Sequence, residues 1–161
     1  MRGVSLFKEY FRNPEANDKA FDAEGWFDTG DVLRIDEEGN LYFGDRNKDM
    51  LKVGGENIAA SEIEHVLMET GWVRECAVVG QKHAMLDEVP VAFVLPAAGA
   101  PEGLAQKLLE VCRARLADFK VPRQIELVDD MPRSTLEKIA KNVLRERLPV
   151  ITEVAERSRR R

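Results

Sequence analysis

Two adjacent glycines, Gly54 and Gly55, constrain this chain more than any other feature because of the residues around them. Residues 50–53 (MLKV) form a short apolar run that suits a buried strand. The glycines after it favour a tight turn, since glycine adopts a positive φ at no steric cost. Residues 45–49 (DRNKD) are polar and charged and suit an exposed connector. A connector, a strand and a glycine turn in this order indicate the entry to a new domain, with its boundary at 45–49.

A helix is expected soon after the glycine turn. Ser61 and Glu64 have the spacing of a capping box, so the helix should begin at Ser61. Near the N-terminus, Asn13 and Pro14 have the pattern of a helix cap and a first helical residue. The chain beyond the connector has a mixed α/β pattern, and a hairpin is expected before it. The remaining apolar patterns predict strands at 32–35, 41–43, 76–79, 89–95 and 124–128 and helices at 104–116 and 139–148.

Composition excludes several classes of function. The chain has 161 residues, 44% of them hydrophobic and 33% charged, and a net charge of −5, so nucleic acid is not an expected partner. Every apolar run is shorter than the ~18 residues of a membrane span. No signal peptide is visible, and a cytoplasmic protein is expected. Cys76 and Cys112 should be reduced thiols in the core. His65 and His83 lack partners at metal-ligand spacing, so no metal site is expected and both should lie at the surface.

Three stretches, in the same order over most of the chain, resemble the adenylate-forming acyl-CoA synthetases. They are residues 25–31 (GWFDTGD), the connector and glycine turn at 44–57, and residues 132–139 (PRSTLEKI). The resemblance implies an α+β fold, the small mobile C-terminal domain of these enzymes, with a short, mainly antiparallel sheet flanked by helices. It also implies a reaction in which a carboxylic acid and ATP, with Mg, form acyl-AMP, and the acyl group then passes to CoA.

The resemblance divides the chain into four parts. Residues 1–45 correspond to a hairpin-containing remnant of the large N-terminal domain, 46–49 to a hinge, 50–148 to the C-terminal lid domain and 149–161 to a charged tail. The family's glycine-rich phosphate loop and acyl pocket belong to the large domain, and no such loop occurs in this chain. We therefore expect the C-terminal fragment of an acid–CoA ligase, inactive alone, with the missing N-terminal domain as its partner and no cofactor bound to the fragment.

Four residues acquire roles in adenylation from the resemblance. Asp31 matches an aspartate that accepts hydrogen bonds from the ribose hydroxyls of ATP, and Arg46 matches an arginine that contacts the nucleotide. Lys48 matches the hinge position. Lys138 matches a catalytic lysine that contacts the substrate carboxylate and the α-phosphate, where negative charge gathers. Glu137 stands where glycine usually precedes that lysine. Turn chemistry for the aspartate, a surface ion pair for the arginine and solvated positions for the lysines remain open.

Five residues acquire roles in thioester formation. Gly54, Gly55 and Glu56 match the loop that lines the pantetheine tunnel. Phe119 and Arg123 match a site in some aryl-CoA ligases, where an aromatic ring stacks on the CoA adenine and basic residues contact its phosphates. A plain β-turn for the glycines and a core position for the phenylalanine are the simpler alternatives.

A different class of function also fits: a stand-alone, non-catalytic module that binds CoA or a partner protein. Residues 85–90 (MLDEVP) and 136–138 (LEK) resemble the crotonobetaine/carnitine-CoA ligase-like branch, which implies fatty acid or carnitine metabolism. The acyl substrate cannot be read from this chain because the acyl pocket belongs to the large domain.

Overall fold

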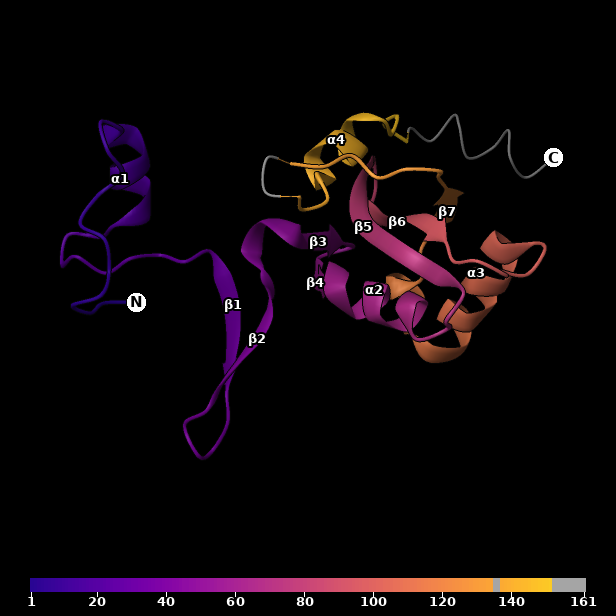
Figure 1. Ribbon diagram of the computed structural model, residues 1–161, viewed down its shortest axis with the longest axis horizontal. Helices are drawn as coiled ribbons and strands as arrows, with labels where there is room; N and C mark the ends of the chain where they lie inside the picture. Colours follow the sequence, from indigo (N-terminus) through magenta and orange to yellow (C-terminus); the bar gives the residue numbers. More distant parts are fainter. Residues whose placement is uncertain (135–136, 152–161) are drawn as a thin grey trace. The chain divides into compact units, whose positions relative to one another are not determined.

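The computed structural model describes residues 1–134 and 137–151 and divides the chain into two compact units (Figure 1). The N-terminal unit comprises Met1 to Lys48, and the C-terminal unit begins at Asp49. This division falls within residues 45–49, the connector in which the sequence places the domain boundary. A short 3-10 helix, Asn47–Asp49, lies at this point of the chain.

The N-terminal unit begins with the short helix α1, Pro14–Ala20, which starts as its sequence predicts. The Asn13 side chain accepts a hydrogen bond from the Ala16 N–H at 3.1 Å, and Pro14 occupies the first turn, where its missing N–H costs nothing. Aromatic rings near this helix contact one another, three pairs edge to face and one tilted. Their centroids are 4.9–5.6 Å apart in a cluster of Phe7, Tyr10, Phe21 and Phe27.

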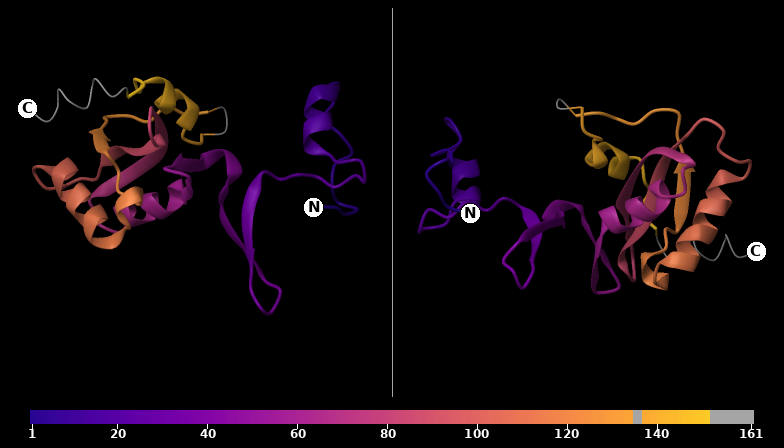
Figure 2. Two further views of the ribbon diagram at one scale, coloured as in Figure 1. Left: turned by 180° about the vertical axis from the view of Figure 1, so that it is seen from behind. Right: turned by 60° about the horizontal axis from the view of Figure 1, so that its bottom comes forward.

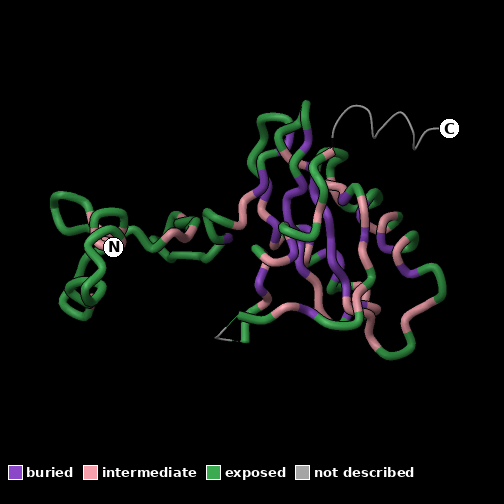
Figure 3. The backbone as a smooth tube through the Cα atoms, turned by 90° about the horizontal axis from the view of Figure 1, so that it is seen from above, coloured by how far each residue is buried: buried purple, intermediate pink, exposed green. Residues whose placement is uncertain are grey.

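The predicted hairpin is confirmed in the same unit. Strands β1, Asp31–Ile35, and β2, Leu41–Arg46, pair antiparallel. Asp36 closes their turn, because its Oδ1 accepts the N–H groups of Glu38 at 3.0 Å and Asn40 at 2.8 Å. The tube in Figure 3 is green along most of this hairpin, since its apolar side chains are largely exposed within the unit.

The C-terminal unit is built on a five-stranded sheet that is antiparallel except for one pair. The order is β4-β3-β6-β5, and β7 pairs with β6 in parallel. The expected α+β fold with a mainly antiparallel sheet and flanking helices is thereby confirmed. Strand β4 was not predicted, because the sequence places a helix directly after the glycine turn. The strands are β3, Met50–Val53; β4, Glu56–Ala59; β5, Val73–His83; β6, Asp87–Pro96; and β7, Gln124–Leu127.

Helices cover both faces of this sheet, which buries the long strands β5 and β6 between two apolar clusters (Figure 2). Successive residues of a strand point to opposite faces, so Val78 packs with the first cluster while Ala77 and Val79 pack with the second. Helices α2 and α3 contribute to the first cluster, and Leu144 of α4 to the second. The helices are α2, Ala60–Met68; α3, Leu104–Arg115; the 3-10 helix η2, Asp118–Lys120; and α4, Lys141–Glu146.

The capping box predicted at Ser61 and Glu64 is wrong. Helix α2 begins after Ala59, whose side chain makes no cap hydrogen bond. Glu64 instead reaches the open edge of β5, where its Oε1 accepts the Val78 N–H at 2.7 Å. Lys141 at the start of α4 contacts the same oxygen at 2.9 Å. One carboxylate therefore joins a helix from each side of the sheet to the strand between them.

The beginning of the expected charged tail belongs to the C-terminal unit. The Ile151 N–H donates to the Lys82 carbonyl at 2.9 Å, and the Ala84 N–H donates to the Ile151 carbonyl at 3.2 Å. The Gln81 side chain also donates to the Pro149 carbonyl at 2.8 Å. Residues 149–151 thus extend the open edge of β5, and the rest of the tail lies outside the described residues.

Both cysteines are free thiols, as expected; Cys112 is buried in the first apolar cluster, and Cys76 is partly buried against it. Burial raises the pKa of Cys76 to about 12, with a further contribution from the Glu64 carboxylate. Burial also raises the pKa of Cys112 to about 11. In the part of the chain that the structure describes, no helix is long and apolar enough to cross a bilayer.

The thiols should make the unit less stable in alkali. Their folded-state pKa values lie above the ordinary 8.5 of a free thiol. The contribution of the two neutral thiols to the free energy of unfolding is therefore fully present below about pH 8.5 and is lost as pH rises through the folded-state values. Urea unfolding from pH 7 to 11 measures the loss, and a Cys76→Ala, Cys112→Ala variant should lose less. Equal pH dependence of both proteins would contradict the assignment.

We expect Glu64→Ala to lower the free energy of unfolding by about 2–3 kcal/mol, because it leaves the buried Val78 N–H without an acceptor. Glu62→Ala on the same helix is the matched control. It removes only a more exposed ion pair with Lys120 and should cost about 1 kcal/mol or less. Urea denaturation measures both, and equal losses would show that the carboxylate of Glu64 has no special role.

Candidate functional site

Asp31 and Arg46 lie opposite each other where β1 begins and β2 ends. The Arg46 Nε is 3.6 Å from Oδ1 of Asp31, which is an ion-pair distance but too long for a hydrogen bond. Among the described residues, Oδ1 of Asp31 is a buried oxygen that accepts no hydrogen bond. The pair therefore retains an unused acceptor beside a cation.

A rigid turn places this pair. The Asp28 side chain accepts the Gly30 N–H at 2.8 Å, and the Thr29 hydroxyl accepts the Asp31 N–H at 3.2 Å. Gly30 has φ of +67°, which glycine adopts without strain. Its carbonyl accepts the Asn47 N–H at 2.8 Å, so the turn also holds the residues after β2.

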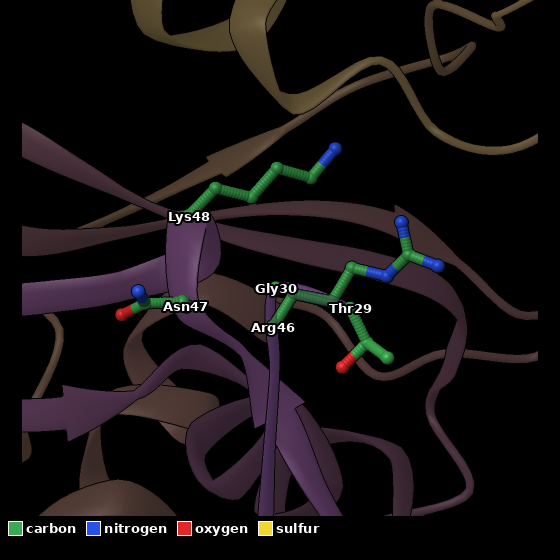
Figure 4. Close-up of a pocket in the computed structure, with 5 residues that line it drawn as sticks. All are labelled: Thr29, Gly30, Arg46, Asn47 and Lys48. Atoms are coloured by element: carbon green, nitrogen blue, oxygen red, sulfur yellow. The ribbon is translucent and has the colours of Figure 1, made fainter. Parts of the chain in front are cut away.

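An open cavity of about 390 Å³ lies at this point of the N-terminal unit. Figure 4 shows the long side chains of Arg46 and Lys48 extending in the same general direction from its wall. Two cations over polar backbone suit an anionic ligand with hydroxyl groups. The cavity is lined by Thr29, Gly30, Arg46, Asn47 and Lys48.

The glycine turn is confirmed as the two-residue connection of the β3–β4 hairpin. Gly54 and Gly55 have φ values of +59° and +91°, and Val53 pairs with Glu56 across them. The Gly54 N–H donates to the Leu86 carbonyl at 3.0 Å, in the turn between β5 and β6. The position of the glycine turn thus depends on a second turn to which the sequence analysis assigned no role.

A second cavity, of about 400 Å³, brings together residues from four elements of the C-terminal unit. Phe119 and Arg123 line it, as do Val53 and Leu86 beside the glycine turn, whereas Gly55 and Glu56 are not among its lining residues. Phe119 is 43% exposed, so the simpler core assignment for its ring is wrong. The full lining is Val53, Leu86, Val89, Pro90, Arg113, Asp118, Phe119, Val121, Pro122 and Arg123.

Arg113 is a lining residue that the sequence analysis missed. It lies near the end of α3, one position after Cys112, which is buried in the core. Its position on the helix opposite the apolar face could have indicated an exposed cation, but not one close to Phe119. Arg113 and Arg123 give this cavity two cations beside an exposed aromatic ring.

Lys138 is exposed on a loop whose ends are joined by a bridge between Arg133 and Ile139. Its carbonyl accepts the Ser134 N–H at 2.8 Å. The Arg133 guanidinium donates to the Glu137 carbonyl at 3.3 Å and to Glu75 of β5 at 2.6 Å.

Glu137 has φ of +57°, so the loop keeps the left-handed conformation at the position where the family usually has glycine. The glutamate therefore preserves the turn before Lys138, at the cost of local strain.

The lysine loop and the glycine turn are held by opposite ends of strand β5. Glu75, which binds the lysine loop through Arg133, is near the start of the strand. Leu86, which binds Gly54, lies just beyond its end. The structure therefore does not bring Lys138 into the cavity of Phe119 and Arg123.

The two histidines differ in environment. His65 is an exposed residue of α2 that contacts Glu69 at 3.0 Å, as expected. His83 is only 8% exposed, so its predicted surface position is wrong. Within residues 1–134 and 137–151, no group of three His, Cys, Asp or Glu side chains is placed to hold a metal ion.

Comparison with known proteins identifies relatives of this arrangement. Residues 62–138 match the AMP-binding enzyme C-terminal domain. A 2-succinylbenzoate–CoA ligase of Listeria innocua is 43% identical over 147 residues, which cover 91% of this chain and 31% of the ligase. A crotonobetaine/carnitine–CoA ligase of Escherichia coli is 40% identical over 144 residues, which cover 89% of this chain and 28% of the ligase.

A solved structure agrees with these sequence relatives. The crystal structure of ATP-bound MatB from Rhodopseudomonas palustris matches with a TM-score of 0.81 at 39% identity, over 90% of this chain and 29% of that chain. The chain thus spans less than a third of the length of each of these three proteins. The family match, the two ligases and the shared fold show that this chain belongs to the adenylate-forming, AMP-binding CoA ligase family and corresponds to its C-terminal portion.

Proposed function

We propose that the chain is the C-terminal part of an ATP-dependent acid–CoA ligase. In the first step, a carboxylate attacks the α-phosphate of ATP, which gives acyl-AMP and releases pyrophosphate. In the second, the CoA thiol attacks the acyl carbon, which gives the thioester and releases AMP. The observation that carries the proposal is that Phe119, Arg123 and Leu86 line one cavity. The carbonyl of Leu86 accepts the N–H of Gly54, so this cavity lies next to the glycine turn.

Asp31 and Arg46 supply the nucleotide contacts in this proposal. The unused oxygen of Asp31 accepts a ribose hydroxyl, and an ionised carboxylate binds such donors strongly. Arg46, which pairs with Asp31, and Lys48 line the neighbouring cavity, of which Asp31 is not a lining residue, and attract phosphate oxygens. Lys48 also marks the hinge, because it ends the N-terminal unit and lies in the short helix Asn47–Asp49.

The second cavity supplies the CoA contacts. The exposed ring of Phe119 stacks on adenine, and Arg113 and Arg123 bind the phosphates. The turn of Gly54 and Gly55 presents backbone without side chains, so pantetheine can approach it closely. Glu56 follows that turn at the start of β4.

Lys138 supplies the cation for the first step. Its ammonium group is exposed and carried by a loop that Arg133 and Glu75 fix to β5. A fixed cation at the attacked phosphate stabilises the charge that develops in the transition state. Since this loop and the glycine turn are held at opposite ends of β5, rotation at the hinge would present them to a shared site in turn.

The missing partner in this proposal is a large N-terminal domain that carries the phosphate loop and the acyl pocket. The chain spans 31% of the Listeria ligase, and the N-terminal unit exposes many large apolar side chains that such a domain would cover. The alternative, a stand-alone CoA-binding module, is favoured by one observation: every lining residue of the second cavity belongs to the C-terminal unit.

The chain alone should form no acyl-AMP, because its sequence contains no glycine-rich phosphate loop. The same chain, exchanged for the matching 31% of the Listeria innocua ligase, should restore acid-dependent exchange of pyrophosphate into ATP. The exchange assay with 2-succinylbenzoate measures both, and the truncated ligase without a replacement is the control. A folded chimera without activity, combined with CoA binding by the chain alone, would favour the stand-alone module.

In that chimera we expect Lys138→Ala to slow acyl-AMP formation by ~10²–10³, because a fixed cation is lost from the site of developing charge. Thioester formation from supplied acyl-AMP and CoA should stay near its normal rate. Lys107→Ala, on an exposed position of α3, is the matched control and should leave both steps unchanged.

Gly55→Leu should give the opposite pattern, with adenylation retained and transfer to CoA impaired. The leucine must adopt φ of +91° and occupies the space that the proposal gives to pantetheine. Circular dichroism and urea midpoints verify folding for all variants. Equal loss of both steps in the folded Lys138 and Gly55 variants would contradict the proposed division of roles.

A further inference from the structure

His83 is a buried residue at the end of β5 to which the proposed function gives no role. We propose that His83 is a positioning residue for the CoA site: it fixes the turn of residues 84–86, and through Leu86 it sets the position of the Gly54–Gly55 turn. The inference rests on the proposed CoA role of the cavity that Leu86 lines.

The first step of the argument is the contact between the imidazole and the turn. Nδ1 of His83 accepts the N–H of Met85 at 3.2 Å and the N–H of Leu86 at 3.3 Å. An imidazole nitrogen accepts only when it carries no proton, so the hydrogen bonds select the tautomer protonated at Nε2. The side chain therefore binds two successive backbone donors of the turn that follows it.

The second step is the contact between this turn and the glycine turn. The carbonyl of Leu86 accepts the Gly54 N–H at 3.0 Å, and Leu86 Cδ2 would lie 3.6 Å from a Cβ built on Gly54. The next residue, Asp87, pairs with Val53, the strand position directly before the glycines. The glycine turn is thus held from one side by Leu86 and the residue after it.

The third step is that the backbone pairing between this hairpin and β6 is short. Val53 with Asp87 is the one pair of residues in register between β3 and β6 within the described part of the chain. The Glu88 carboxylate adds a hydrogen bond to the Lys52 N–H at 3.0 Å. Because the ladder is so short, the shape of the turn that His83 holds has a large influence on where the glycines lie.

The backbone of His83 is itself held in place by the last described residue of the chain. Ile151 forms a bridge with His83, and its carbonyl accepts the N–H of Ala84. Its own N–H donates to Lys82, so the last described residue of the chain flanks the histidine on both sides. A buried imidazole held in this way can place the turn accurately, which an exposed side chain could not.

The test compares two substitutions in the full chain. His83→Asn keeps an acceptor, because the asparagine Oδ1 can occupy the place of Nδ1, whereas His83→Leu fills the space but accepts nothing. His65→Leu, at the exposed histidine of α2, is the control for loss of an imidazole. The measurements are amide exchange of Gly54 by NMR and the Kd for CoA by calorimetry.

We expect His83→Leu to speed Gly54 exchange and to raise the Kd for CoA, each by about tenfold, as for the loss of one or two hydrogen bonds. His83→Asn should stay within about twofold of the unaltered chain, as should His65→Leu. Amide protection of Val78, whose N–H is accepted by the Glu64 carboxylate and not by the turn, should remain in all variants and verifies folding.

Two results would overturn the inference. Unchanged Gly54 exchange in folded His83→Leu would show that the histidine does not control the glycine turn. Faster exchange with an unchanged Kd would show that the turn does not control the ligand site. Failure of the unaltered chain to bind CoA would instead overturn the CoA assignment of the cavity, while the exchange of Gly54 still decides whether His83 controls the turn.

Discussion

The C-terminal unit depends on one carboxylate at the edge of its sheet. Glu64 reaches from α2 to the backbone of Val78, in the middle of β5, and binds Lys141 of α4 with the same oxygen. An edge strand between two apolar layers would otherwise bury an N–H with no acceptor, which costs free energy and leaves a site for another chain to pair. Glu64 removes both problems, and its ion pair joins the helices that cover opposite faces of the sheet.

The same strand separates the two regions to which we assign chemistry. One end of β5 supports the Lys138 loop through Glu75, and the other continues into the turn that contacts Gly54. A rigid strand keeps the distance between these regions constant, so a rotation of the whole unit moves both together. This geometry suits an enzyme that needs a cation in one step and a backbone surface in the next.

Local sequence signals predicted much of the fold. Asn13 with Pro14 begins a helix because both act on backbone within one turn of themselves. The two glycines make a turn because φ is a property of the single residue. Glu64 was assigned to a cap because a partner three residues away was visible in the sequence, whereas its true partner lies 14 residues on.

The functional residues were harder to predict because their partners, like that of Glu64, lie far away in the sequence. His83 is buried and its backbone pairs with Ile151, close to the end of the described chain, which a reading of its sequence neighbours cannot reveal. Arg133 supports the lysine loop through Glu75, 58 positions earlier in the chain. The hairpin of β1 and β2 has a consequence of another kind. Among the described residues this sheet has only two strands, so each strand has an outer edge, and most of the apolar side chains of the hairpin are exposed within the unit. Where nothing covers those edges, they offer a template for strand pairing between molecules, so the colloidal behaviour of the chain should depend on its concentration.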